Sequence, residues 1–204
     1  MSRRKKIRKH YEPRIHPEKA SHEILDWSSC DSQIARFEVL LGNIDLAGKS
    51  LLDVGCGLGD LWKFLGQRGV PVTYTGVDLL EKMVEEARRR CPDARFVVAD
   101  IFAGEAFGNE RFDVVFCSGA FNLDLGNNLE FLVRAVRRML ELSRRWVVFN
   151  LLHERARRFY SHRAYRYYEP EEVLRLLEPL GCRTRVVDDY LPNDFTMICE
   201  SAGE

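Results

Sequence analysis

From residue 50 onward, short apolar runs alternate with longer amphipathic stretches. The apolar runs contain many β-branched, aromatic and leucine residues, and they lie at residues 50–54, 72–77, 94–99, 112–117 and 146–151. The stretches between them carry apolar residues at helical spacing, at residues 60–68, 80–90 and 129–142. Apolar strands that alternate with helices are typical of a parallel sheet covered on both faces. The pattern therefore predicts a doubly wound α/β fold.

The C-terminal part adds a helix and two strands to this core. Residues 169–180 form the expected helix, with Pro170 in its first turn and Gly181 just past its end. The strands at residues 183–187 and 195–200 follow closely enough to pair as a hairpin. Such a hairpin would give the sheet an antiparallel edge.

Ahead of the core, residues 18–42 predict a helical cap of two helices. Ile34 and Phe37 lie at helical spacing in the second of them, and Asp31 or Ser32 is its expected N-cap. A chain of 204 residues fits one domain. We expect that domain over residues 18–204, behind a basic, flexible tail at residues 1–17.

Charge is unevenly spread, although the formal net charge is zero. Six of the first ten residues are basic, which leaves 25 basic against 31 acidic residues in the rest of the chain. An acidic body disfavours non-specific binding to duplex nucleic acid.

Hydrophobicity and cysteine spacing indicate the cellular compartment of the protein. No apolar run approaches the roughly 20 residues that span a bilayer, and no hydrophobic stretch follows the basic N-terminus as in a secretory signal. The six cysteines are scattered and form no C-x-x-C pair, so neither a zinc site nor a disulfide framework is expected. These features favour a cytoplasmic protein that takes no metal.

The most informative motif follows the first strand and opens the next helix. Its glycines, Gly55, Gly57 and Gly59, are spaced G-x-G-x-G, and Asp53 lies two residues before the first. A dinucleotide fingerprint needs a small residue where this chain has Asp60. A carboxylate beside the loop suits an ammonium group better than a pyrophosphate, which argues against an NAD-dependent oxidoreductase.

Two more carboxylates follow strands. Asp78 ends the second strand, where a ribose diol can donate two hydrogen bonds to it, and Asp100 follows the third, where it can accept from an exocyclic amine. The carboxyl ends of parallel strands lie at the same edge of a sheet, so we expect these carboxylates to lie together with Asp53.

With these motifs the chain resembles the class I S-adenosylmethionine-dependent methyltransferases over most of residues 31–200. The resemblance rests on the glycine motif, on Asp78 and Asp100, on the fourth strand 112–117 with Ser118 and Gly119, and on the helix start at 167–172. It implies a seven-stranded sheet of order 3-2-1-4-5-7-6 with strand seven antiparallel. It also implies a cofactor-binding core at residues 50–151 and a substrate-facing part at residues 152–204.

The resemblance further implies S-adenosyl-L-methionine as cofactor, S-adenosyl-L-homocysteine as product, and a role for each residue of a cofactor site. Asp53 and the backbone of Gly55 to Gly57 would hold the methionine moiety, while Asp78 would bind the ribose hydroxyls. Leu79 and Met83 would pack on the adenine, and Asp100 with Ile101 would read its edge. The carbonyls near Ser118 would face the amino group, and Arg36 would pair with the methionine carboxylate. The expected cofactor-binding residues are thus Arg36, Asp53, Gly55, Cys56, Gly57, Asp78, Leu79, Met83, Asp100, Ile101 and Ser118.

Motifs that would narrow the methyl acceptor are missing. Asn/Asp-Pro-Pro-Tyr/Phe does not follow the fourth strand, and the Pro-Cys nucleophile of a cytosine C5 enzyme is absent. A small-molecule methyltransferase, monomeric or weakly dimeric and without a membrane partner, is the interpretation that remains. An RNA methyltransferase and a non-catalytic cofactor-binding or scaffold protein stay open as alternatives.

The segment 153–168 carries five arginines, five aromatic residues and one acid. Loops after the carboxyl ends of parallel strands face the ligand crevice, so arginines here favour an anionic acceptor. Arg157, Tyr160 and Arg163 are the expected substrate-binding residues, and His153 is the candidate general base. Stacked bases of single-stranded RNA would fit the same segment.

Overall fold

The computed structural model describes residues 2–16, 18–104, 106–159 and 161–201. The chain divides into two compact units, Met1–Asp100 and Ile101–Glu204. The strands of the two units are ordered β3-β2-β1-β4-β5-β7-β6 in a seven-stranded sheet, which confirms the predicted order. The prediction of one domain over residues 18–204 stays a prediction.

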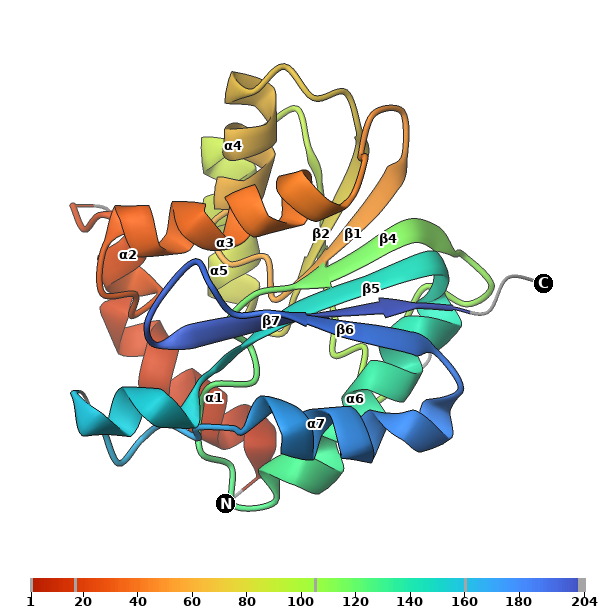
Figure 1. Cartoon of the computed structure of the whole chain (residues 1–204). Coiled ribbons are helices and arrows are strands. Elements are labelled where there is room, and N and C mark those ends of the chain that lie inside the picture. The colour runs from red at the N-terminus through yellow and green to blue at the C-terminus, as the bar shows by residue number, and fades with distance from the viewer. Residues whose placement is uncertain (1, 17, 105, 160, 202–204) are drawn as a thin grey trace. The chain divides into compact units, whose positions relative to one another are not determined.

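The first unit contains three parallel strands and the helices between them. The strands are β1 (Ser50–Val54), β2 (Thr73–Asp78) and β3 (Arg95–Val98), and the helices are α4 (Asp60–Gln67) and α5 (Glu81–Arg90). Helix α5 packs on β2 and β3 (Figure 1). Four of the five residues of β1 are buried, as expected of a strand with neighbours on both faces. These strands and helices lie within two residues of their predicted bounds.

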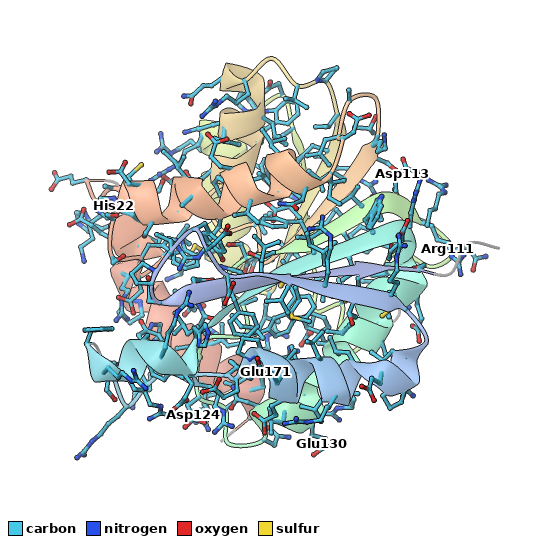
Figure 2. All side chains as sticks on the ribbon, viewed as in Figure 1. His22, Arg111, Asp113, Asp124, Glu130 and Glu171 are labelled. Atoms are coloured by element: carbon cyan, nitrogen blue, oxygen red, sulfur yellow. The ribbon has the colours of Figure 1, made fainter. Side chains whose placement is uncertain are left out.

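The N-terminal segment of the first unit differs from the prediction. It forms helix α1 (Arg3–Tyr11), a 3₁₀ turn η1 (Glu12–Arg14), α2 (Ser21–Ile24) and α3 (Cys30–Asn43). Where the sequence predicts a tail, the structure forms helix α1, which carries six basic residues and also an apolar pair, Ile7 and Tyr11, one turn apart. The flexibility of residues 1–17 stays a prediction. The N-cap of α3 is Ser29, whose Oγ accepts from the Ser32 N–H at 3.1 Å, and neither Asp31 nor Ser32. His22, labelled in Figure 2, marks α2.

The second unit holds the remaining strands. They are β4 (Phe112–Cys117), β5 (Ser143–Leu152), β6 (Arg183–Val187) and β7 (Asp194–Glu200). Strand β5 pairs parallel with β4 and antiparallel with β7, and β7 pairs antiparallel with β6. The predicted antiparallel hairpin is therefore confirmed.

The helical elements of this unit connect and cover its strands. They are α6 (Asn128–Leu142), the 3₁₀ helix η2 (Glu154–Arg158), α7 (Pro170–Leu177) and the 3₁₀ turn η3 (Glu178–Leu180). Helix α6 packs on β4 and β5, and α7 packs on β6; both lie along the same face of the strands in Figure 1. Among the described residues, no helix is both long and apolar enough to cross a bilayer.

Candidate functional site

Asp53 is the next-to-last residue of β1, and its side chain is 4% exposed. The Tyr74 hydroxyl on β2 donates to Asp53 Oδ2 at 2.7 Å. Burial raises the pKa of Asp53 to about 7, and the Asp78 carboxylate adds to the rise while the Tyr74 hydrogen bond opposes it. This carboxyl therefore changes charge near neutral pH.

The glycine loop between β1 and α4 turns tightly over the end of β2. The backbone N–H groups of Gly55 and Cys56 donate to the Val77 carbonyl at 2.8 and 3.1 Å. Gly57 has a φ of +53°, and Gly59 has a φ of +80° at the N-cap of α4. L-residues rarely adopt such angles, so the backbone explains the G-x-G-x-G spacing.

Asp78, at the end of β2, is held by the loops on either side of it. Gly57 N–H donates to its Oδ2 at 3.1 Å, and Leu80 N–H donates to its Oδ1 at 2.9 Å. Burial raises the pKa of Asp78 to about 6, although these backbone donors favour the carboxylate. Each oxygen keeps capacity to accept from a further donor. The structure thus brings the predicted Asp53, Gly57 and Asp78 together.

The predicted adenine-packing surface belongs to a small apolar cluster. Met83 is 2% exposed and clusters with Ile24, Leu58 and Leu80. Leu79 packs against this cluster, and so do side chains from the N-terminal segment, namely Ile7, Tyr11, Ile15 and Leu25. The segment before residue 26 therefore contributes to the surroundings of Leu79 and Met83.

Further contacts join the N-terminal segment to predicted site residues. Arg3 forms an ion pair with Asp100. A Cβ added to Gly57 would lie 2.7 Å from Leu25 Cδ2. Burial raises the pKa of Tyr11, and the Asp26 and Asp78 carboxylates raise it further. Sequence reasoning missed Arg3, Tyr11 and Leu25, and the Ile7–Tyr11 spacing was the signal that could have indicated a packed helix.

Arg36 lies on α3 and is 2% exposed. Its guanidinium stacks 4.2 Å from the centroid of the Trp27 ring and donates to the Ser32 carbonyl. The predicted pairing of Arg36 with a methionine carboxylate stays a prediction. Ile101 and Ser118 belong to the second unit, and their cofactor roles also stay predictions.

In the second unit, a buried polar chain fixes the loop after β4. Gly119 N–H donates to Asn150 Oδ1 at 2.8 Å, and Asn150 Nδ2 donates to Asp194 Oδ1 at 3.3 Å. The Tyr190 hydroxyl donates to the same Asp194 oxygen at 2.8 Å. Ser118 Oγ, next to Gly119, is buried and has no hydrogen-bond partner within the described residues.

The predicted substrate residues after β5 lie in different surroundings. Arg157 is exposed, forms an ion pair with Glu154 at 2.5 Å and stacks 4.8 Å from the Tyr167 ring centroid. Arg163 is exposed, and Tyr160 lies outside the described residues.

His153 caps the short helix η2. Its Nδ1 accepts from the Arg155 N–H at 3.2 Å, and its ring meets Phe195 edge-on. Burial and the Arg155 guanidinium hold the pKa of His153 below its usual value. The lowered pKa favours the neutral imidazole. The use of His153 as a general base stays a prediction.

Residues 51–142 match the model of a methyltransferase domain family. The chain is 35% identical over 103 residues to the malonyl-[acyl-carrier protein] O-methyltransferase of Acetivibrio thermocellus, a match that covers 48% of this chain and 36% of that protein. It is 32% identical over 167 residues to the ubiquinone biosynthesis O-methyltransferase of Bordetella parapertussis, which covers 78% of this chain and 63% of that protein. It also resembles the trans-aconitate 2-methyltransferase of Delftia acidovorans, 41% identical over 63 residues, or 30% of this chain and 24% of that protein.

Solved structures show the same fold. The CcbJ methyltransferase from Streptomyces caelestis superposes with a TM-score of 0.71 and 16% identity, covering 97% of this chain and 96% of that one. The magnesium protoporphyrin IX methyltransferase from Synechocystis, solved with bound SAH, superposes with a TM-score of 0.61 and 16% sequence identity. The match covers 97% of this chain and 93% of that one. By sequence, the chain spans about a quarter to a half of the length of several curated relatives.

Proposed function

We propose that this chain, which belongs to the class I S-adenosylmethionine-dependent methyltransferases, binds S-adenosylmethionine and moves its methyl group to an N, O or C nucleophile of a small anionic molecule. The product would be S-adenosylhomocysteine, and the reaction would need no metal. A cytoplasmic location and a monomeric or weakly dimeric state stay predictions.

The observation that carries the proposal is the fixed carboxylate of Asp78 beside the glycine loop. Gly57 and Leu80 donate one hydrogen bond to each of its oxygens, so its position is set before any ligand arrives. A carboxylate held in this way suits a ribose diol, whose two hydroxyls both donate. Asp53, buried behind the same loop, suits the ammonium group of the methionine moiety and would repel a pyrophosphate.

The cofactor supplies a methyl group already activated by a positively charged sulfur. The chain therefore has to bind, to orient and to exclude water, and positioning of this kind can account for most of a rate enhancement. Asp53 would take the charged form when the ammonium binds, since an opposite charge lowers a carboxyl pKa. Asp78 would orient the ribose. The two carboxyls, Asp53 and Asp78, would together favour the positively charged cofactor.

An anionic acceptor is supported by the five arginines of segment 153–168 and by two relatives whose names specify acidic acceptors, malonyl-[acyl-carrier protein] and trans-aconitate. RNA is the second candidate, because exposed basic side chains lie one turn apart on α1, at Arg4 and Arg8 and at Lys5 and Lys9.

Radiolabelled S-adenosylmethionine incubated with the protein and fractionated cell extract tests the proposal. We expect label in the small-molecule fraction, and much less label with the Asp78→Ala variant. Label in the RNA fraction would mean that the methyl acceptor is RNA and not a small anionic molecule. A complete lack of transfer by a protein that still binds the cofactor would favour the non-catalytic alternative.

A further inference from the structure

The loop after β4 and the segment after β5 meet in a short antiparallel bridge in the second unit. Leu123 pairs with Tyr165, the Arg166 N–H donates to the Asn122 carbonyl at 2.8 Å, and the Asp124 N–H donates to the Ala164 carbonyl at 2.7 Å. Asp124, labelled in Figure 2, marks this meeting point. Since β4 and β5 run parallel, both segments leave the carboxyl end of a strand, where α/β sheets bind their ligands.

This pairing sets Asn122 opposite Arg166. Residues directly opposite each other in an antiparallel pair extend their side chains on the same face, with Cβ atoms roughly 4.5–5.5 Å apart. The amide and the guanidinium therefore leave the backbone side by side. No other Asn–Arg pair is opposed in this way across the strand and bridge pairings of the described residues.

Both side chains have a buried polar atom that nothing in the described part of the chain satisfies. Asn122 is 6% exposed, and neither its Oδ1 nor Arg166 Nε has a hydrogen-bond partner there. Buried polar atoms in proteins are nearly always paired, so two such atoms on neighbouring side chains indicate a place where a ligand supplies the partners. One is an acceptor and the other is a charged donor.

The surroundings hold this pair in place. The Arg166 guanidinium stacks 5.7 Å from the Tyr168 ring centroid. The Tyr168 hydroxyl donates to the Phe121 carbonyl at 3.0 Å and accepts from Asn128 Nδ2 at 3.3 Å. The ring that supports Arg166 is thus tied to the residue before Asn122, which lowers the entropic cost of ordering the site when a ligand binds.

We propose that Asn122 and Arg166 form the binding subsite for the methyl acceptor, and that the acceptor is a hydroxy acid. Arg166 Nε–H donates to a carboxylate oxygen of the acceptor, and Asn122 Oδ1 accepts from a hydroxyl on the neighbouring carbon. The inference rests on the proposed function and makes its substrate class specific. It also moves the anchoring role from the exposed Arg157 and Arg163 to Arg166.

Binding of matched acids in the presence of S-adenosylhomocysteine tests the subsite without requiring turnover. The hydroxy acids lactate, malate, citrate and mandelate are compared by ligand-observed NMR with propionate, succinate, tricarballylate and phenylacetate, which lack the hydroxyl. We expect at least one hydroxy acid to bind about tenfold more tightly than its partner. Asn122→Ala should remove that advantage, and Arg166→Lys should weaken both acids of the pair about tenfold or more.

Matched controls separate this test from that of the proposed function. Asn109→Ala and Arg137→Ala change exposed residues of the same types outside segment 153–168 and should leave acid binding unchanged. Wild-type affinity of the two subsite variants for S-adenosylhomocysteine would show that they are folded. The subsite is wrong if no hydroxy acid binds better than its partner, or if Asn122→Ala and Arg166→Lys leave the preference intact. Loss of S-adenosylhomocysteine binding in the wild-type protein would instead contradict the proposed function.

Discussion

Asp53 is an ionisable group enclosed within the first unit, with Tyr74 as its hydrogen-bond donor. Burial raises its pKa to about 7, so between about pH 4 and pH 7 the folded protein holds a proton that the unfolded chain has released. The stabilising contribution of this group is fully present below its unfolded pKa and is lost as the pH rises through its folded pKa. Near pH 7 this carboxyl is therefore partly protonated in the ligand-free protein, and a cationic ligand would favour its charged form.

We expect the free energy of unfolding of the ligand-free protein to fall between pH 5.5 and pH 7 by up to about 1.4 kcal/mol per pH unit from this group. Asp53→Asn should flatten that slope and stabilise the protein at pH 8, while Asp78 retains a similar slope over the lower and narrower range from about pH 4 to pH 6. Urea unfolding at several pH values measures the effect. Asp45→Asn is the control, because that side chain is 79% exposed. An Asp53→Asn variant with the wild-type slope would show that Asp53 is ionised throughout.

Gly57 adopts a backbone conformation that L-residues rarely take. Its φ is +53°, and an added Cβ would lie 2.7 Å from Leu25 Cδ2, so Gly57→Ala should cost about 1–3 kcal/mol of unfolding free energy. Gly66, inside α4, has nothing within 4 Å of its Cβ position, so Gly66→Ala should stabilise by about 0.5–1 kcal/mol. Thermal unfolding compares the two. Equal effects of both substitutions would mean that the loop tolerates an L-residue at position 57.

The sequence could predict that Asp53, the glycine loop and Asp78 lie together, while their roles toward a cofactor stay a proposal. Asp53, the glycines and Asp78 each follow a strand or end one, and parallel strands bring their carboxyl ends to one edge. Asn122 and Arg166 could not be predicted, since 43 residues separate them and only a bridge of the folded chain sets them opposite each other.

At the scale of elements, the N-terminal segment departs most from its predicted form. Helix α1 is basic on its exposed face, and its other face gives Ile7 and Tyr11 to the cluster around Met83. The sequence predicts a flexible tail there because charge dominates the composition of this stretch. Two apolar residues one turn apart are enough to make it pack, since the cluster supplies the rest of the apolar surface.

Deletion of residues 1–26 should weaken the binding of S-adenosylhomocysteine about tenfold or more, because Tyr11, Ile24 and Leu25 would no longer pack beside Met83 and Gly57. Calorimetric titration of the shortened protein measures the loss, after circular dichroism has shown that the core is folded. Arg4→Ala combined with Lys5→Ala, at exposed positions of α1, is the control and should bind normally. Tighter binding after the deletion would mean that the segment occupies the place of the ligand.

The burial patterns of the two C-terminal strands differ according to their places in the sheet. Strand β7 is buried at six of its seven positions, whereas β6 alternates and has exposed residues. That contrast is consistent with β7 between two neighbours and β6 at the edge. The hairpin could be predicted from the spacing of the two strands. The position of β7 between β5 and β6 was implied only by the family resemblance.

For the whole molecule, the alternation of strands and helices predicts the α/β class, and the family resemblance supplies the strand order that the structure confirms. The identity of the acceptor does not follow from the fold, because one fold hosts many acceptors and the groups that bind them lie on loops. Binding of the cofactor can nevertheless be tested without an acceptor.

Calorimetric titration with S-adenosylhomocysteine, and with NAD as the alternative ligand, measures which of the two the protein binds. We expect binding of S-adenosylhomocysteine and none of NAD. Asp78→Ala should weaken binding by about 1.5–3 kcal/mol, roughly 10- to 100-fold, because two hydrogen bonds from the ribose would be lost. Glu85→Ala, an exposed acid on α5, should bind as the wild type does. Binding of NAD would overturn the choice of cofactor, and an unchanged S-adenosylhomocysteine affinity in Asp78→Ala would overturn the ribose-binding role of Asp78.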